Sequence, residues 1–334
     1  MLSELLITTI DSHTAGMPTR LVVSGFPEVP GASMAEKRQY IINHYDYLVR
    51  MIIDEPRGHI AMRGGVLFPP TRPDADAGVV FIGGGCMPSC GHSSIGIAVS
   101  LIETSRVKVT EPLTKIVLET PAGVTETRTQ VCNGMCGFVT FRNIPAFLFA
   151  EDVKLDVPGI GSLQLDIGYG GNFFAILSAE QVGLSVEPAN ATRFVQAAGV
   201  IKEAVNKAIK VAHPENPIYD HLTHIEFYGP PRHKEAHVKN IVISPPGMVD
   251  RSPCGTGTCA KMAVLHAKGQ LDLGEEFVHE NVIGEDFKGK LCGTVRVGGR
   301  EAVVPEISGT AHLTGLHTFL ADPRDSLRYG FRLA

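Results

Sequence analysis

Two segments of the sequence begin with the same short pattern and continue in parallel. The first, from residue 88, reads "PSCGHSSIGIAVSLIETSRVKV", and the second, from residue 252, reads "SPCGTGTCAKMAVLHAKGQLDL". Aligned on Cys90 and Cys254, they share a Cys-Gly pair, small hydroxyl residues after it, and a distal turn into a strand. An internal duplication is the economical explanation, and it constrains the chain to fold as two similar halves.

The rest of each half repeats the same order of elements. Strands are followed by a long helix, by further strands, and then by the short helix that the cysteine leads. The long helices are expected over 33–53 and 190–212, and Ser33 with Glu36 forms a capping box at the start of the first. The loop-rich stretch at 145–165 is where the halves are expected to meet. The chain is therefore predicted to have two similar halves, each with strands and helices.

Charge and length exclude several classes of partner. The 334 residues carry 30 Lys+Arg and 35 Asp+Glu, a formal net charge of −5, which gives no electrostatic reason to expect nucleic acid or an anionic membrane as a partner. The apolar runs are shorter than a membrane span, and the N-terminus lacks the basic start and apolar core of a signal peptide. We expect a cytoplasmic protein that acts on a small molecule.

The seven cysteines are too sparse for a disulfide framework and are expected to be reduced. Cys132 and Cys136 flank an Asn-Gly pair, which is typical of a hairpin turn, and no second Cys/His pair stands at zinc spacing. No metal and no cofactor are predicted.

A cysteine at the start of a helix has chemical consequences. The helix start carries unsatisfied N–H groups and roughly half a positive charge, which favour the thiolate and can also hold a carboxylate. Gly91 and Gly255 allow a ligand close to the backbone, and hydroxyl residues such as Ser93 and Thr256 offer hydrogen bonds. One such cysteine alone is often only a small buried residue.

Two such cysteines favour proton transfer. One thiolate can remove a proton from one face of a carbon while the opposite thiol returns one to the other face. A cysteine hydrolase needs only one nucleophile with a base beside it. A dinucleotide loop would need a third glycine where Pro88 stands, and Lys261, expected to be exposed or snorkelling, is a poor candidate for a Schiff base.

Four motifs resemble the signatures of the proline racemase family: "IDSHTAG", "EPRGH", "CGHSSIG" and "DRSPCGTGT". The resemblance runs from residue 7 to the C-terminus. It implies the α/β (α+β) fold of the diaminopimelate-epimerase-like kind. In this fold two pseudo-symmetric domains each have a curved mixed sheet around a central helix, and the active site lies between them. On this fold we expect the domains at 1–150 and 151–314, with a strand segment at about 315–334 returning to the first.

The family resemblance also implies roles for individual residues, without a cofactor. Relatives use two catalytic cysteines, which match Cys90 and Cys254. The remaining matches, all implied to bind substrate, are Gly91, His92, His224, Asp250, Gly255 and Thr256.

Three of these substrate-binding matches also have a purely structural interpretation. His92 could instead cap the helix, and Asp250 could be a turn residue that pairs with Arg251. His224 lies in an apolar strand and could be a core histidine.

Other motif residues are interpreted as structural. Asp11, His13 and Arg57 are expected to be supports, and Cys86 and Cys259 to be packing residues.

The choice among family members rests on a few positions. Dehydratases of the family usually have threonine at the second cysteine position, so Cys254 favours two-sided exchange. His224 resembles the epimerases, in which a histidine can bond a ring hydroxyl. The prediction is a 4-hydroxyproline 2-epimerase, an isomerase that converts trans-4-hydroxy-L-proline to cis-4-hydroxy-D-proline and forms a homodimer. Proline racemase, trans-3-hydroxy-L-proline dehydratase and a non-catalytic amino-acid-binding relative are the alternatives.

Two positions depart from the family pattern. Pro88-Ser89 replaces the usual pair before the first cysteine, and Arg63 replaces an aromatic or small apolar residue. Arg63 is interpreted either as a rim residue that bonds a ring hydroxyl or as a solvent-facing loop residue.

Overall fold

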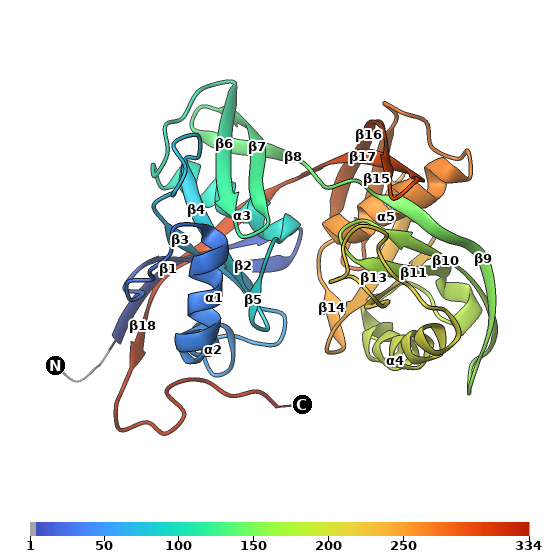
Figure 1. The fold of residues 1–334 in the computed structure, drawn as a ribbon, viewed down its shortest axis with the longest axis horizontal. Coiled ribbons are helices and arrows are strands. Elements are labelled where there is room, and N and C mark those ends of the chain that lie inside the picture. Colours follow the sequence, from blue (N-terminus) through green and yellow to red (C-terminus); the bar gives the residue numbers. More distant parts are fainter. Residues whose placement is uncertain (1–4, 334) are drawn as a thin grey trace. The chain divides into compact units, whose positions relative to one another are not determined.

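The chain divides into two compact units in a computed structural model that describes residues 5–333. Unit 1 comprises Met1–Phe141 and Gly309–Ala334, and unit 2 comprises Arg142–Ser308 (Figure 1). Unit 2 begins at Arg142, whereas the sequence predicts its start at residue 151. The strand Phe147–Val157 belongs to unit 2 because it pairs with the strand Gly161–Tyr169 of the same unit.

Unit 1 contains nine strands and three helices among its described residues. They are β1 (Leu5–Thr14), β2 (Met17–Ser24), α1 (Met34–His44), α2 (Asp46–Ile53), β3 (Arg63–Phe68), β4 (Ala77–Ile82), β5 (Cys86–Met87), α3 (Gly91–Glu103), β6 (Leu113–Thr120), β7 (Gly123–Cys132), β8 (Met135–Arg142) and β18 (Ala311–Ala321). The strand order is β18-β1-β2-β3-β4-β6-β7-β8, with β5 paired to β4. The pairs β2–β3 and β4–β6 are parallel, and the others are antiparallel.

Unit 2 repeats this arrangement. Its elements are β9 (Phe147–Val157), β10 (Gly161–Tyr169), β11 (Phe173–Ser178), two short 3₁₀ turns (Ala179–Val182 and Pro188–Asn190), α4 (Ala191–Ala208), β12 (His224–Gly229), β13 (Val238–Ser244), β14 (Met248–Asp250), α5 (Gly255–Ala267), β15 (Glu276–Asn281), β16 (Asp286–Val297) and β17 (Arg300–Gly309). The strand order is β9-β10-β11-β12-β13-β15-β16-β17, with β14 paired to β13.

The two strand orders match one to one, which confirms the predicted duplication. The parallel pairs β11–β12 and β13–β15 correspond to β2–β3 and β4–β6 of unit 1. Strand β18 is the outer strand of the sheet in unit 1, and β9 is the equivalent outer strand in unit 2. The C-terminal strand is therefore the strand that completes the sheet of unit 1.

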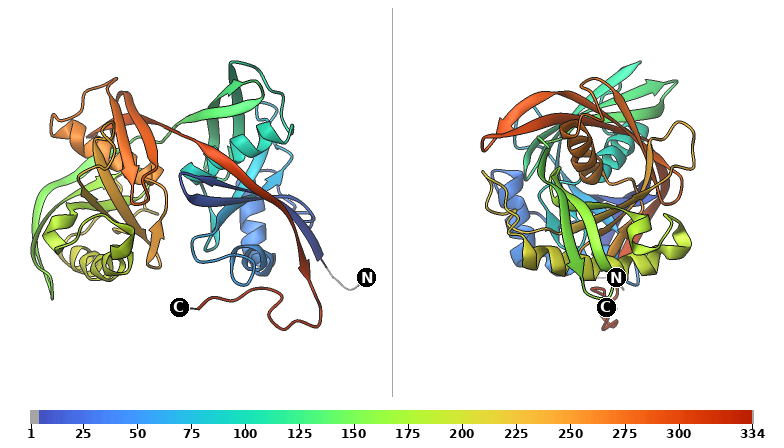
Figure 2. Two further views of the ribbon diagram at one scale, coloured as in Figure 1. Left: turned by 180° about the vertical axis from the view of Figure 1, so that it is seen from behind. Right: turned by 90° about the vertical axis from the view of Figure 1, so that its right-hand side faces the viewer.

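One helix in each unit lies inside the curve of its sheet. In unit 1 this helix is α3, which is buried from His92 to Ile102 and packs against β1, β2, β7 and β18. In unit 2 it is α5, which packs against the corresponding strands β9, β10, β11 and β16 (Figure 2). Glycines make this close packing possible: a Cβ on Gly170 would lie 2.2 Å from the backbone oxygen of Thr256 on α5.

The long helices differ in detail from the prediction. The segment expected as one helix over 33–53 is two helices, because Tyr45, with φ −128° and ψ 17°, ends α1 and begins α2. The predicted Ser33 cap is present, since Ser33 Oγ accepts from the N–H of Glu36 at 3.2 Å, but the Glu36 carboxylate accepts from Ala32 N–H. The second helix ends at Ala208 instead of 212, because Ile209 takes an extended conformation.

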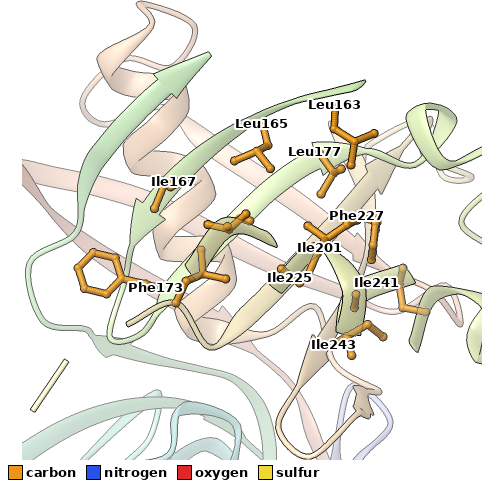
Figure 3. Close-up of a cluster of buried hydrophobic side chains, with 14 of the residues drawn as sticks. Leu163, Leu165, Ile167, Phe173, Leu177, Ile201, Ile225, Phe227, Ile241 and Ile243 are labelled. Atoms are coloured by element: carbon orange, nitrogen blue, oxygen red, sulfur yellow. The ribbon is translucent and has the colours of Figure 1, made fainter. Parts of the chain in front are cut away.

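Strand β12 separates the apolar core of unit 2 from a polar face. Ile225 and Phe227 point into a core that includes Leu163, Leu177, Ile201, Ile241 and Ile243 (Figure 3). Successive residues of a strand point to opposite faces, so His224, Glu226 and Tyr228 share the other face. That face packs against α5, because Lys261 of α5 lies over the ring of Tyr228.

Cys132 and Cys136 lie on the β7–β8 hairpin that the sequence predicts. Cys132 pairs with Met135, and Asn133 and Gly134 form the turn with φ values of 52° and 74°. Positive φ at both positions is the pattern of a type I′ turn. In the described part of the chain, no helix is long and apolar enough to cross a membrane.

Candidate active site

Cys90 is the N-cap of α3 and is partly exposed. Its thiol donates to Oγ of Ser93 at 3.2 Å, and its Sγ lies 3.5 Å from Nδ1 of His92. Oγ of Ser93 lies 3.2 Å from Nε2 of His92, so the three side chains form one hydrogen-bonded group at the helix start. The carbonyl of Cys90 accepts from the N–H and the hydroxyl of Ser94, which fixes the cap conformation.

The surroundings of Cys90 favour the thiolate. Burial raises the pKa of the Cys90 thiol, but the charge of His92 and hydrogen bonds from His92 and Ser93 outweigh burial and bring the pKa below its usual range. His92, whose exposed fraction is 9%, therefore does more than cap the helix, although its carbonyl also accepts a hydrogen bond from Thr14. The arrangement can hold a base that accepts a proton.

Cys254 occupies the equivalent position at the start of α5 and is buried, with a φ of 65°. Asp250 forms the turn before it: Oδ1 accepts from the N–H of Ser252 at 2.9 Å and from its hydroxyl at 2.8 Å. The hydroxyl of Ser252 in turn accepts from Cys254 N–H at 3.2 Å. Asp250 thus acts as a turn residue, while Arg251 donates to the carbonyl of Val249.

The surroundings of Cys254 favour the thiol. Burial and the negative charge of Asp250 raise the pKa of the Cys254 thiol well above its usual value, and Glu226 adds to the effect. Hydrogen bonding to Thr256 and to the N–H of Gly257, which lies 3.4 Å from Sγ, opposes the shift but is weaker. The arrangement can hold an acid that donates a proton, the complement of Cys90.

The residues after each cysteine form the closely packed first turns of α3 and α5. A Cβ on Gly91 would lie 3.0 Å from the ring of Phe141, so the position has little room for a side chain. Gly255 is buried, and Oγ1 of Thr256 lies 3.6 Å from Sγ of Cys254. The first N–H groups of α3 and α5 are the donors that a carboxylate would use.

His224 lies at the start of β12 on the face that α5 covers. Its Nδ1 is 2.7 Å from the hydroxyl of Thr223, and its ring centroid is 4.8 Å from that of Phe174. Phe174 belongs to the same buried apolar cluster as Cys254. His224 is half-buried and lies at the edge of that cluster, so it differs from a fully buried core histidine such as His279.

The expectation for Lys261 is wrong. The side chain has an exposed fraction of 6%, and Nζ lies 3.4 Å from the centroid of the Tyr228 ring. The reason is that position 261 is on the face of α5 that packs against β12, where the ammonium contacts an aromatic ring instead of water. Burial lowers the pKa of Lys261 to about 8.

Arg63 is also buried, which contradicts the interpretation as a solvent-facing loop residue. Its exposed fraction is 9%, and Nη1 donates to the carbonyls of Ile60 and Met62 at 3.1 and 3.0 Å. A Cβ on Gly83 would lie 2.2 Å from Cδ of Arg63, so the glycine gives the arginine its space. Arg63 therefore braces the turn that enters β3.

The predicted supports contact backbone groups and the side chain of Arg20. Asp11 accepts from Nε and Nη2 of Arg20, and Nη1 of Arg20 donates to the carbonyl of Arg57 at 2.6 Å. Arg57 donates to the carbonyls of Leu320 and Arg328, which attaches the C-terminal segment to unit 1. His13 accepts from the N–H of Gly16 in the β1–β2 turn.

The other two cysteines near the helix starts have the character of packing residues. Burial raises the pKa of Cys86 to about 11 and that of Cys259 to about 12. Cys259 also accepts a hydrogen bond from the Asn143 amide at 3.2 Å. Among the cysteines for which a shift is resolved, only Cys90 has a lowered pKa.

Two residues near Cys254, Ser252 and Glu226, are not among those predicted from the sequence. Ser252 precedes the cysteine by two residues and was visible in the motif. Glu226 had a weaker signal, the alternation of His224, Glu226 and Tyr228 along one strand face. Residues 5–333 contain no group of three or more His, Cys, Asp or Glu side chains that could hold a metal ion.

Known proteins resemble this chain over nearly its whole length. A proline racemase from Clostridioides difficile is 46% identical over 328 residues, 98% of both chains. A 4-hydroxyproline 2-epimerase from Streptosporangium roseum is 43% identical over 334 residues, the full length of both chains.

A solved structure confirms the predicted fold class. The crystal structure of a hydroxyproline epimerase from Agrobacterium vitis, with bound trans-4-OH-L-proline, has a TM-score of 0.88 and 32% identity. The similarity covers 100% of this chain and 96% of that one. The sequence profile named Proline racemase matches residues 9–332. Together with the two helix-start cysteines, these matches establish that the chain belongs to the proline racemase family.

Proposed function

We propose that the protein is an isomerase, a 4-hydroxyproline 2-epimerase that interconverts trans-4-hydroxy-L-proline and cis-4-hydroxy-D-proline with two cysteines and no cofactor. The observation that carries the proposal is the pair of cysteines at equivalent helix starts, Cys90 before α3 and Cys254 before α5, whose surroundings lower the pKa of the first thiol and raise that of the second. A reaction that removes one proton and returns another needs one thiolate and one thiol at the same time.

In the proposed reaction, the Cys90 thiolate takes the α-proton and the Cys254 thiol donates a proton to the opposite face of the same carbon. The carbon–hydrogen bond on one face breaks as its electron pair passes to the carbon, and a new carbon–hydrogen bond forms on the other face. The enzyme is left with a Cys90 thiol and a Cys254 thiolate, ready for the reverse direction. N–H groups at the starts of α3 and α5 would hold the substrate carboxylate and stabilise its developing negative charge.

Hydroxyproline is favoured as the substrate by His224. Its half-buried ring lies beside the apolar cluster that contains Cys254, and it can bond a ring hydroxyl. A site that bonds a hydroxyl leaves polar groups unpaired when the substrate lacks it. The names of the Streptosporangium and Agrobacterium relatives support this substrate.

Proline racemase is the second candidate. The Clostridioides relative that bears this name is 46% identical, slightly more than the Streptosporangium epimerase at 43%. The chemistry at the α-carbon is the same, so only the contact with the ring distinguishes the two.

The test compares kcat/KM for trans-4-hydroxy-L-proline and L-proline by optical rotation, using protein treated with a chelator and a carbonyl reagent. We expect full activity after this treatment and a kcat/KM for hydroxyproline at least about tenfold higher, the value of one good hydrogen bond to a buried group. His224→Ala should narrow that gap by lowering the hydroxyproline rate preferentially. Equal rates on both substrates in the parent enzyme would identify a proline racemase, and activity that returns only with an added metal or pyridoxal phosphate would refute the cofactor-free mechanism.

A further inference from the structure

A cluster of buried ionisable side chains lies behind Cys254 in unit 2. Glu226 of β12 and His279 of β15 have no exposed surface, and Oε1 of Glu226 lies 3.7 Å from Nε2 of His279. Lys261 of α5 has its ammonium over the ring of Tyr228 and contributes the positive charge that acts on Glu226. Such a cluster is costly to bury, so its presence calls for an explanation beyond packing.

The carboxylate of Glu226 lies close to the thiol. A Cβ built on Gly257 would lie 2.9 Å from Oε2 of Glu226 and 3.3 Å from Sγ of Cys254. Because both atoms are that near to one point, they are within about 6 Å of each other. The absence of a side chain at Gly257 leaves nothing from that residue between them.

The polar atoms of the cluster are not saturated by the surrounding protein. Both carboxylate oxygens of Glu226 and Nε2 of His279 have no hydrogen-bond partner among residues 5–333. The other ring nitrogen of His279, Nδ1, lies 2.9 Å from the hydroxyl of Thr258, and this hydrogen bond orients the ring. Asn240 opposes the raised pKa of Glu226 but does not overcome burial. Once it is ionised, Glu226 raises the pKa of the Cys254 thiol.

The titration of the cluster follows from its burial. Burial raises the pKa of Glu226 to about 8, against the opposing charge of Lys261, and lowers the pKa of His279 to about 3. His279 is thus neutral at neutral pH. The charges of Asp166 and Lys268 also act on Lys261. Besides Glu226, Cys254 faces the carboxylate of Asp250, the hydroxyl of Thr256 and the N–H of Gly257. Glu226 is mostly protonated at neutral pH and ionises before Cys254 as the pH rises. Its ionisation then disfavours that of Cys254, because ionising either group disfavours the other.

We propose that Glu226 is a positioning residue that keeps Cys254 in its thiol form while Cys90 carries the thiolate. The proposal deepens the proposed function and rests on it. His92 at the first helix start, and burial with Asp250 at the second, already give the two cysteines different surroundings. Glu226 adds to this difference, so that the enzyme without substrate holds one base and one acid.

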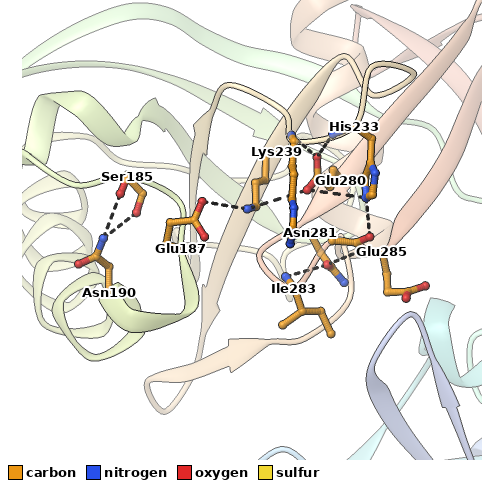
Figure 4. A network of polar contacts seen from close by, with 11 residues as sticks. Ser185, Glu187, Asn190, His233, Lys239, Glu280, Asn281, Ile283 and Glu285 are labelled. Atoms are coloured by element: carbon orange, nitrogen blue, oxygen red, sulfur yellow. Dashed lines mark hydrogen bonds and ion pairs between the residues drawn. The ribbon is translucent and has the colours of Figure 1, made fainter.

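Unit 2 offers a matched control, Glu280 on β15. It is also fully buried, and its carboxylate accepts from the N–H groups of Arg232 and His233, with Lys239 at 3.9 Å (Figure 4). Glu280 does not contribute to the shifted pKa of Cys254. A Glu280→Gln change therefore reproduces the loss of a buried carboxylate in the same unit without changing the charge at the thiol.

The experiment measures the ionisation of Cys254 directly, without substrate. In Cys90→Ser protein, the rate of Cys254 alkylation by iodoacetamide is followed against pH by peptide mass spectrometry. We expect the midpoint pH of Cys254 alkylation to lie above that of an ordinary thiol. The Glu226→Gln change in the same Cys90→Ser protein should lower this midpoint by about one to two pH units, because that is the effect of a charge about 6 Å away at an effective dielectric constant of about 20. Glu280→Gln should leave the midpoint in place.

Three results would overturn the proposal. They are an unchanged midpoint in the Glu226→Gln protein, an equal shift in the Glu280→Gln protein, and a Cys254 midpoint in the Cys90→Ser protein at or below that of an ordinary thiol. The last measurement stands even if Glu226→Gln does not fold, which a thermal melt would reveal. Because alkylation needs no turnover, its outcome is independent of whether the substrate assignment is right.

Discussion

At the residue scale, the two cysteines are nearly identical in their local sequence and opposite in their chemistry. Both are N-caps followed by glycine, yet His92 lowers the pKa of one, whereas burial, Asp250 and Glu226 raise the pKa of the other. The first effect is local in sequence and could be predicted from the Cys-Gly-His motif. The contribution of Glu226 comes from a strand 28 positions earlier in the chain and depends on pairing that no local pattern reveals.

His92→Asn is expected to move the acid limb of the pH profile of kcat/KM for the isomer whose α-proton Cys90 removes. A thiol with a lowered pKa acts as a base above that pKa and loses this role as pH falls through it. Without the charge of His92 the pKa of Cys90 rises, so the limb should move to higher pH by about one unit, the effect of one partly exposed charge. His44→Asn, on the exposed end of α1, is the control. An unmoved acid limb would show that His92 does not set the ionisation of Cys90.

At the scale of elements, the sequence predicted which segments repeat but not where the chain bends. The cysteine-led helices and the Asn-Gly hairpin follow from local signals, namely glycine, hydroxyl residues and turn chemistry. The break at Tyr45 has no proline or glycine to announce it. It accompanies the packing of the Tyr45 ring against Phe26 and Tyr40, a tertiary contact.

Gly170→Ala is expected to destabilise unit 2 and to reduce turnover. The new Cβ would lie 2.2 Å from the backbone oxygen of Thr256 and 2.6 Å from the backbone nitrogen of Ala260, so α5 must shift. We expect a cost of about 1–3 kcal/mol and a lower Tm, with kcat reduced because the start of α5 carries Cys254.

Gly199→Ala provides the contrast for this experiment. Gly199 lies on the exposed face of α4, and its Cβ would meet no atom within 4 Å. Alanine there should raise stability by up to about 1 kcal/mol, since it restricts the unfolded chain, and should leave kcat unchanged. A Gly170→Ala protein as stable and active as the parent would mean that α5 tolerates the displacement.

At the scale of the whole molecule, the duplication places one helix-start cysteine in each unit. Cys90 belongs to unit 1 and Cys254 to unit 2, and each unit supplies its own helix start. The sequence predicted this division because the repeat is long and its order is preserved. It did not predict that the equivalent strands would match pair for pair, because parallel pairing is a long-range property.

Cys90→Ser or Cys254→Ser alone is expected to abolish epimerisation, since a serine hydroxyl is far too weak an acid or base to replace the thiol. Either variant should still exchange the α-hydrogen of one isomer with deuterium from solvent, because the remaining thiol reaches one face. The measurement combines optical rotation with NMR of the α-hydrogen in heavy water, after a thermal melt confirms folding. A folded Cys254→Ser protein that interconverts both isomers at nearly the parental rate would refute the division of roles.

The position of β18 also determines the order in which the molecule can be completed during synthesis. The ribosome releases β1 first and β18 last, although the two strands pair along their whole length from Leu5↔Ala321 to Thr14↔Ala311. Unit 2 is one continuous stretch of chain, so it can finish folding before β18 has been synthesised and has paired with β1 at the edge of the sheet in unit 1. An uncovered strand edge is a template for association with other chains, which makes the nascent N-terminal unit dependent on protection until the last residues emerge. The half of the protein that is made first is the half that is finished last.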